Sequence, residues 1–241
     1  MPIREGEIDY GFMEEFIAKL NADRLAKLNA YRSITGLKDY TLTPQEEQAL
    51  HRFQAGNIEW QEYKLGNLFD IQNTLSFNKE ALVQGSEYDY ITRTSFNQGI
   101  LQTTGFVNKE NLNEAGVWSL GLLQIDFFYR NREWYAGQFM RKIISKVDLP
   151  QRSILFFTTL LNRLKPVLLS VLVRDVDKTF LNSTILLPNT NGEIDYGYME
   201  TLISAVQKLV IKEVVQYADR EIAATRQVID ESPLRANIPS K

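Results

Sequence analysis

Apolar residues recur with a helical period at both ends of the chain. Over residues 10–33 and 196–230 they step by three, four or five positions, which is typical of an apolar stripe along one face of a helix. The stripe positions correspond between the two ends: Ile17 with Ile203, Leu20 with Val206, Leu25 with Ile211, Leu28 with Val214, and Tyr31 with Tyr217. The pattern predicts two equivalent amphipathic helices, Tyr10–Ser33 and Tyr196–Asp230.

A short repeat marks the beginning of each predicted helix. The segment Gly-Glu-Ile-Asp-Tyr-Gly occurs twice, 186 residues apart. Each copy supplies an N-cap, Asp9 or Asp195, and a glutamate, Glu14 or Glu200, that we place in the first turn, where a carboxylate favours the helix dipole. A single apolar stripe must be buried, so we expect coiled-coil-like packing against the other repeat helix, within the chain or from a second copy. A terminal duplication with no role beyond packing is the alternative, and the separation of the copies argues against a solenoid.

The residues between the repeats predict one globular domain of strands and helices. A connector, residues 37–59, contains a short helix after Thr43-Pro44, and strand signals dominate from Trp60 onward. We expect strands at Tyr88–Thr94, within Val117–Tyr129 and at Lys178–Pro188, where the proline ends the strand. One helix is expected to bury a face that holds Phe156, Phe157, Leu160, Leu161 and Leu164. The predicted fold class is α+β: a globular domain with a mixed sheet, residues 60–190, flanked by long repeat helices in residues 1–36 and 191–241.

The composition is that of a folded protein. Of its 241 residues, 44% are hydrophobic and 24% charged, and there is no cysteine, which excludes disulfides, thiolate zinc sites and cysteine nucleophiles. The N-terminus is acidic and lacks an apolar core, and no apolar stretch is long enough to span a membrane, so we expect a cytoplasmic protein that does not bind membranes.

The charge is unevenly distributed along the chain. The formal net charge is −3, which argues against indiscriminate nucleic-acid binding. Between Arg130 and Arg174, however, nine basic residues stand against two acidic ones, a local net charge of +7. This segment indicates either a basic binding surface or a chance cluster on a solvated face.

Motifs of catalysis are missing from the sequence. It has no Gly-x-Gly-x-x-Gly, no Gly-Lys-Ser/Thr phosphate loop, no Gly-x-Ser-x-Gly elbow and no Asn-Pro-Pro-aromatic motif of DNA amino-methyltransferases. The single histidine, His51, excludes multi-histidine metal sites and favours a surface or capping role. Glu62-Tyr63-Lys64 looks like half of a nuclease metal motif, but no Pro-Asp element precedes it. We therefore predict a non-catalytic chain without a metal or cofactor of its own.

Four segments together resemble a known family. They are WQEYKLGNLFDI from Trp60, YDYITRTSFNQGI from Tyr88, FFYRNREWYAGQFMRKI from Phe127 and ILLPNTNGEIDYGYMETLI from Ile185. Their order, together with the repeated helices, resembles the specificity subunit of type I, or closely related type IIB, restriction–modification enzymes. The resemblance covers nearly the whole chain.

The resemblance implies a subunit that recognises DNA and has no catalytic activity itself. Residues 60–190 would be a target-recognition domain that reads half of a split double-stranded DNA site. The repeat helices would act as a spacer and dock a methyltransferase subunit, which carries the S-adenosylmethionine, with a restriction subunit as a further partner. Most such subunits hold two recognition domains, whereas this chain has one between its helices. We therefore expect a half-subunit that forms a homodimer on a palindromic split site; a truncated or split subunit that needs a different second half is the alternative.

Two polar stretches that leave strands are the expected readers of this site. Phosphate contacts need Lys and Arg, and base edges are read by Arg, Asn, Gln, Ser and Thr. The predicted base contacts are Arg93, Thr94, Ser95, Asn97 and Gln98, then Arg130, Asn131, Arg132, Tyr135 and Gln138, with Arg141, Lys142 and Lys146 on the DNA backbone. Alternatively, at least two of Trp134, Tyr135 and Phe139 belong to the core.

Two other classes of function stay open. A coiled-coil scaffold whose globular domain binds protein would associate with DNA weakly or not at all, independently of salt. A small enzyme with a carboxylate site would need activity from the isolated chain, and acidic pairs such as Asp175/Asp177 or Glu87/Asp89 are too common to indicate one.

Overall fold

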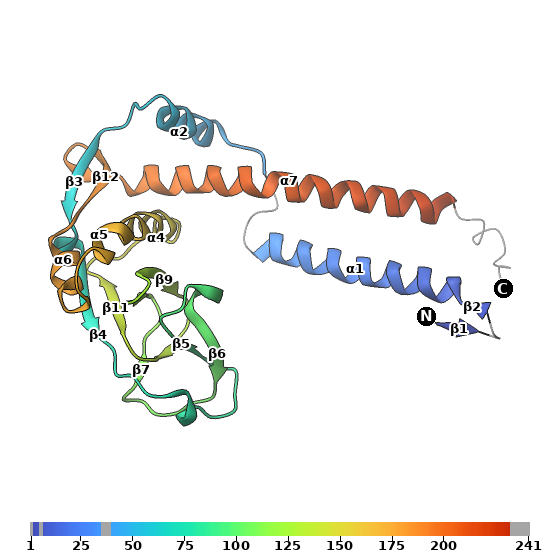
Figure 1. Cartoon of the computed structure of the whole chain (residues 1–241). Helices are drawn as coiled ribbons and strands as arrows, with labels where there is room; N and C mark the ends of the chain where they lie inside the picture. The colour runs from blue at the N-terminus through green and yellow to red at the C-terminus, as the bar shows by residue number, and fades with distance from the viewer. Residues whose placement is uncertain (1, 5–6, 35–39, 232–241) are drawn as a thin grey trace. The chain divides into compact units, whose positions relative to one another are not determined.

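The structure is a computed structural model that describes residues 2–4, 7–34 and 40–231 (Figure 1). Residue contacts divide the chain into two units. The end unit comprises Met1–Leu50 and Ser204–Lys241, and the middle unit comprises His51–Ile203. The two ends of the chain therefore share one unit, whereas the middle unit is a continuous segment.

The longest described helices follow the two copies of the sequence repeat. α1 spans Tyr10–Ile34 and α7 spans Tyr196–Glu231; before α1, the short strands β1 (Ile3–Arg4) and β2 (Glu7–Ile8) pair antiparallel. The amide of Phe12 donates to Asp9 Oδ1 (2.9 Å) and the amide of Tyr198 to Asp195 Oδ1 (2.8 Å). Asp9 and Asp195 are thus the N-caps, as predicted.

The two predicted first-turn glutamates lie elsewhere. Glu14 and Glu200 are each the fifth residue of their helix, and neither helix has an acidic residue in its first turn. The placement in the first turn was therefore wrong, because the helices begin directly after their aspartate caps and leave both glutamates beyond the reach of the free amides.

Most of the described apolar stripe residues of both helices are exposed, whereas Ile203 and Ile211 are half-buried. On α1, Ile17 and Leu20 are 53% and 39% exposed; on α7, Val206, Val214 and Tyr217 are 41%, 52% and 61% exposed. The side chains of Leu25, Leu28 and Tyr31 lie outside the described residues. The same part of α7 also has a buried side, with Ala205 and Val215 fully covered.

A buried ion pair joins α7 to α2 (Pro44–Gln54), the short helix expected after Thr43-Pro44. Thr43 and Glu46 cap each other's amides at the start of α2 (3.3 and 2.7 Å). The Glu46 carboxylate also accepts hydrogen bonds from Ser204 Oγ (2.7 Å) and Lys208 Nζ (2.8 Å). The side chains of Glu46 and Lys208 are only 8% and 14% exposed. Of the predicted connector, residues 37–39 lie outside the described residues.

The pKa of Glu46 reflects these contacts. Burial acts to raise it, but hydrogen bonds from Lys208, the Thr43 amide and Ser204, with the charge of Lys208, lower the pKa from the ordinary 4.5 to about 2. Because the pKa is depressed on folding, the stabilisation by the carboxylate is present above about pH 4.5 and is lost as the pH falls towards 2.

Glu46→Gln is therefore expected to destabilise the protein at neutral pH and to matter less in acid. The difference in unfolding free energy between wild type and variant should shrink between about pH 5 and about pH 3. Chemical denaturation of the full chain at several pH values measures it, with Glu47→Gln, an exposed glutamate on the same helix, as the control. A difference that does not change with pH would contradict this assignment.

The strands of the middle unit form three sheets among the described residues. The first has the order β6-β5-β10-β7, with β5 at Tyr88–Ile91, β6 at Ile100–Thr104, β7 at Leu112–Asn113 and β10 at Trp134–Ala136. The second has the order β4-β11-β8-β9, with β4 at Phe69–Asn73, β8 at Val117–Gly121, β9 at Asp126–Arg130 and β11 at Met140–Ser145. The third has the order β13-β12-β3, with β3 at Trp60–Lys64, β12 at Thr184–Thr190 and β13 at Glu193–Ile194. β10 pairs parallel with β5 and antiparallel with β7, so the first sheet is mixed and the α+β class is confirmed.

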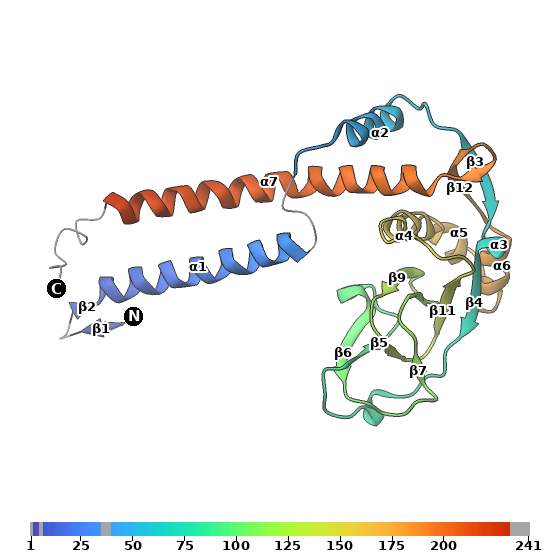
Figure 2. The same cartoon turned by 180° about the vertical axis from the view of Figure 1, so that it is seen from behind.

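Short helices cover these sheets. They are α3 (Leu65–Leu68), α4 (Ser153–Arg163), α5 (Lys165–Leu169) and α6 (Val176–Asn182), with single turns η1 (Lys79–Ala81), η2 (Phe96–Gly99) and η3 (Val173–Asp175). α4 lies against β9 in both views (Figures 1 and 2). Its predicted apolar face is confirmed: Phe157, Leu161 and Leu164 are buried with Phe69 and Trp118 of the sheet, and Phe156 and Leu160 pack against the same cluster.

The predicted strand at Lys178–Pro188 was partly wrong. Residues up to Asn182 form α6, and the strand begins at Thr184 and continues beyond Pro188. Phe180 explains the first error, because this aromatic residue of an apparent strand is a fully buried helical residue. The strand does not stop at the proline because neighbouring groups carry on the pairing: Asn189 N donates to Glu59 O (2.8 Å) and Asp195 N to Pro188 O (2.9 Å).

Candidate nucleic-acid interface

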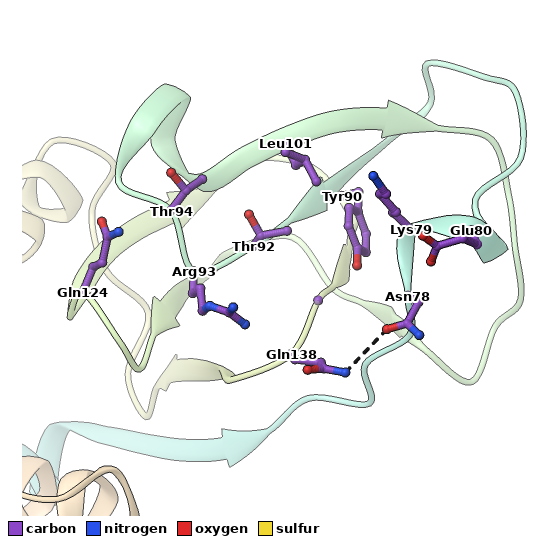
Figure 3. Close-up of a pocket in the computed structure, with 11 residues that line it drawn as sticks. Asn78, Lys79, Glu80, Tyr90, Thr92, Arg93, Thr94, Leu101, Gln124 and Gln138 are labelled. Carbon is purple, nitrogen blue, oxygen red and sulfur yellow. Dashed lines mark hydrogen bonds between the residues drawn. The ribbon is translucent and has the colours of Figure 1, made fainter.

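An open groove on the middle unit gathers polar side chains from distant parts of the sequence (Figure 3). Its volume is about 620 Å³. Three of the predicted DNA contacts line it, namely Arg93, Thr94 and Gln138. The groove thus brings together the two polar stretches that the sequence analysis singled out separately.

Parallel pairing of β5 and β10 explains this meeting. Ile91 and Ala136 are partners at the ends of these strands, and Gly137 N donates to Ile91 O (2.8 Å). Two parallel strands leave the sheet at the same edge, so the segments that follow them emerge side by side. A Cβ at residue 137 would lie 3.1 Å from the Tyr90 hydroxyl and 3.2 Å from a methyl of Thr92, which explains the glycine there.

The remaining lining residues were not predicted. Among them are Asn78, Lys79, Glu80, Tyr90, Thr92 and Gln124. Gln138 Nε2 lies 3.5 Å from Asn78 Oδ1, which ties the two edges of the groove together. Burial and the Glu80 carboxylate raise the pKa of Tyr90, whose hydroxyl donates to Phe77 O (2.7 Å). No sequence motif marks these residues, since the fold alone places the loop around η1 beside the end of β5.

Arg93 is the cation best placed for a ligand in the groove. Its side chain is exposed, and the guanidinium stands 5.4 Å from the Phe139 ring, whose face it covers. The backbone of Arg93 lies so close to β8 that a Cβ at Gly121 would come within 3.0 Å of its Cα atom. A cation on a fixed backbone, next to amide and hydroxyl groups, is the combination that reads base edges and phosphates.

The other residues of the first stretch form a turn beside the groove. Ser95 N donates to Gln124 Oε1 (3.0 Å), and the Ser95 hydroxyl contacts Gln124 and Asp126. Asn97 Nδ2 donates to Ile100 O (3.2 Å), and the Gln98 side chain is exposed. Ser95, Asn97 and Gln98 are therefore all at the surface, although the Ser95 hydroxyl and the Asn97 amide already have partners within the chain.

Arg130 and Tyr135 lie in the interior, unlike the sequence prediction. Arg130 is 3% exposed; its guanidinium donates to Ser119 Oγ (2.6 and 2.8 Å) and to Gln98 O (2.5 Å). Burial lowers the pKa of Arg130 to about 10, against an opposing effect of Asp89, so it is charged at neutral pH. The fully buried Tyr135 hydroxyl binds the backbone of Val107 and Asn108. Because Trp134 is also fully buried while Phe139 is half exposed, two of these three aromatic residues belong to the core, as the alternative reading had it.

The basic segment is largely neutralised in the fold. Six of its nine cations form ion pairs with acids from outside the segment: Arg132 with Asp89, Arg141 with Asp177, Lys142 with Glu114, Lys146 with Asp70, Lys165 with Asp126, and Arg174 with Asp175. The three predicted backbone contacts, Arg141, Lys142 and Lys146, are all in this set, and Lys146 lines a second depression rather than the groove. Asn131 is exposed. The segment with the net charge of +7 therefore does not form a surface of unpaired positive charges.

Arg132→Ala is expected to destabilise the protein as well as to affect a ligand. Arg132 Nε donates to Asp89 Oδ2 (2.9 Å), and the Asp89 side chain is only 9% exposed. Loss of the guanidinium leaves a buried carboxylate without its partner, which costs roughly 1–3 kcal/mol. Denaturant unfolding measures this, and the double variant Arg132→Ala/Asp89→Asn should recover part of the loss. A double variant as unstable as the sum of both single changes would contradict the pairing.

Within the described residues, nothing points to a metal centre or a membrane span. No cluster of three or more histidine, aspartate or glutamate side chains could hold an ion. His51 is exposed in the last turn of α2, which agrees with the predicted surface role. None of the helices combines the length and apolar character that a bilayer crossing requires.

Comparison with known proteins gives one family and several solved structures. Residues 57–216 match the family described as the type I restriction modification DNA specificity domain. The similar structures include the S subunit of a type I restriction–modification system from M. genitalium, at 13% identity and a TM-score of 0.45 over 89% of this chain and 57% of that one. The HsdS subunit from Thermoanaerobacter tengcongensis matches at 15% identity and a TM-score of 0.45, over 85% and 51% of the two chains. A structure reported for the complex assembly and conformational transition of the type I system matches at 15% identity and a TM-score of 0.49, over 88% and 56%. The chain thus spans about half the length of these structures, and no curated protein matches it.

Proposed function

The chain belongs to the family of type I restriction–modification DNA specificity domains, and from this premise we propose that it is a non-catalytic subunit that recognises a specific double-stranded DNA sequence. The observation that carries the proposal is the groove, where Arg93, Thr94 and Gln138 meet at one edge of the first sheet. These are residue types that read base edges. Lys79 adds a second cation to the same groove.

The DNA contacts that we propose are the members of the predicted set that reach the surface. Arg93, half-buried Thr94 and Gln138 would face the bases, with the exposed residues Ser95, Asn97, Gln98, Asn131 and Arg132 around them. Arg141, Lys142 and Lys146 would reach the DNA backbone only by exchanging their acidic partners for phosphate. Arg130 and Tyr135 are buried and would hold the backbone of Gln98 and of Val107 and Asn108 in place rather than contact DNA.

The repeat helices suggest how the subunit assembles. On α7, Val206, Leu209, Val210 and Val214 are exposed apolar residues at helical spacing, and α1 exposes Phe16, Ile17 and Leu20. Because the ends of the chain carry the same sequence pattern, the economical partner is a second copy of the same helices. The protein would then be a homodimer in which two recognition units read a symmetric, split site.

In this arrangement the subunit directs partner enzymes. An adenine methyltransferase subunit with bound S-adenosylmethionine would dock on the helices, with a restriction subunit as a further partner. The chain itself holds no cofactor in this proposal. The end unit would set the distance between the two half-sites.

Binding to duplex DNA at several salt concentrations tests the proposal against the scaffold alternative. A DNA-recognition subunit should bind duplex DNA with an affinity that falls steeply as salt rises, because phosphate contacts release counterions. The measurement uses the full chain together with its methyltransferase partner and sheared DNA from the host. No binding, or binding independent of salt, would favour a protein-binding scaffold.

A further inference from the structure

A phenylalanine projects from the turn beside the groove. Phe96 is 84% exposed, the largest exposed fraction among the large apolar side chains that the structure describes. Its neighbours Thr94, Ser95, Asn97 and Gln98 are polar. An aromatic ring so fully in water gains none of the stabilisation that burial gives elsewhere in the protein, and its face is available to a partner outside the chain.

The backbone of this turn is fixed although the ring is free. Thr92 N donates to Gly99 O (2.8 Å) across the base of the turn, and Phe96 N donates to Thr94 Oγ1 (3.2 Å). On one side of the turn, the backbone amide of Ser95 donates to Gln124 Oε1 (3.0 Å). On the other side, the buried guanidinium of Arg130 donates hydrogen bonds to Ser119 Oγ and to Gln98 O (2.5 Å). These bonds fix the guanidinium and connect it to the turn.

The turn also holds a left-handed backbone conformation, which asparagine and glycine accept but glutamine disfavours. Asn97 and Gln98 both have positive φ (47° and 54°), and Gly99 follows with φ of 80°. Residues with a Cβ rarely adopt this left-handed region, and two in succession persist only where the surroundings impose it. A Cβ at Gly99 would lie 3.1 Å from Thr92 O and 3.3 Å from Arg130 Nη2, so the turn closes directly over the guanidinium. Arg130 donates to the carbonyl of Gln98 within this turn, which has Phe96 at its end.

We infer that Phe96 contacts the bases as an apolar wedge and that Arg130 is the positioning residue that holds it ready. The inference rests on the proposed function. Thr94 and Gln124 line the groove and also form hydrogen bonds with the turn. DNA that binds Arg93 in the groove would therefore lie next to Phe96. Apolar side chains that enter a base step unstack it and kink the duplex. A ring carried on a rigid turn meets the DNA without losing conformational freedom on binding.

The experiment uses the full chain in complex with its methyltransferase subunit and a duplex that contains the motif methylated in the host. 2-Aminopurine, whose fluorescence rises on unstacking, replaces one base of the motif at a time. Besides the methylated adenine, which the methyltransferase itself extrudes from the duplex, wild type should raise the fluorescence at one further position, and Phe96→Ala should abolish this further rise and weaken binding about tenfold. Phe106→Ala is the matched control: this phenylalanine is 54% exposed and follows the far end of β6 from the turn.

The outcomes separate this inference from the proposed function. If wild type methylates no motif, the proposed function is refuted and the wedge with it. If the motif is intact but Phe96→Ala binds and unstacks like wild type, only the wedge is refuted. The wedge is also refuted by a different pair of results: wild type unstacks no base, and replacing a thymine of the motif by uracil weakens binding as much as Phe96→Ala does. The ring would then contact a thymine methyl group instead of entering a base step.

The role of Arg130 has its own readout. Arg130→Lys keeps a charge but loses the planar fork that joins Ser119 to Gln98 O. In this background Phe96→Ala should have little further effect on unstacking, because the tip is no longer held. Should Arg130→Lys unfold the protein, Ser119→Ala removes the same anchor from the opposite side. A full additional loss from Phe96→Ala in the Ser119→Ala background would overturn the positioning role.

Discussion

Replacing Val210 and Val214 by glutamate is expected to convert the proposed homodimer to a monomer and to abolish methylation by the proposed complex. The two valines lie one turn apart on α7 and are 72% and 52% exposed. Burying a valine side chain contributes roughly 1.5–3 kcal/mol, and each copy supplies two. A carboxylate buried without a partner adds a further cost. Dimer affinity should therefore fall by at least roughly a thousandfold.

Gln216→Glu provides the matched control for this prediction. It adds the same charge to an exposed residue of the same helix, but about 120° around the axis from Val210 and about 160° from Val214. Light scattering of the purified chain and methylation by the reconstituted complex are the two measurements. A double valine variant that stays dimeric, or one that is monomeric yet methylates normally, would contradict assembly through this face.

Arg93→Ala is expected to weaken binding of the cognate DNA by about 5- to 150-fold, which corresponds to roughly 1–3 kcal/mol. The guanidinium has a fixed backbone and stands over the Phe139 ring at the edge of the groove. Its loss removes a charge-assisted contact without leaving a buried group unpaired, because the side chain is exposed. The folded stability of the variant should stay close to that of wild type.

The control for Arg93 is Arg163→Ala, an exposed arginine in the last turn of α4 that does not line the groove. Both variants lose one positive charge, so a general electrostatic effect would lower their affinities equally. Titration of duplexes with and without the methylated motif separates the two cases. Equal small losses for both variants would remove Arg93 from the set of base contacts.

Local signals explain what could be predicted from the sequence. The N-caps Asp9 and Asp195 bind amides three residues ahead, so the determining residues are neighbours in the chain. The buried face of α4 follows from helical spacing alone. Lys178–Asn182 was misassigned because a short segment with one aromatic residue has no clear period, and the packing of Phe180 in the core decided for a helix.

Long-range contacts decided the rest of the site. The charge of Arg130 predicted a surface residue, but Ser119 and the carbonyl of Gln98, from two other segments, bury it. The acids that neutralise Arg141 and Lys146 lie 36 and 76 positions away, and no local pattern announces them. Lys79 and Asn78 reach the groove only because the fold brings the loop around η1 to the end of β5.

Mapping methylated adenines in a host that expresses this chain with its genomic neighbours tests the central claim most directly. A homodimer with one recognition unit per chain should yield a bipartite motif whose two halves are inverted copies of each other. The motif should disappear when the chain is omitted and the methyltransferase is kept. A motif with two different halves would contradict the homodimeric half-subunit, and the absence of any motif that depends on the chain would contradict its role in DNA recognition.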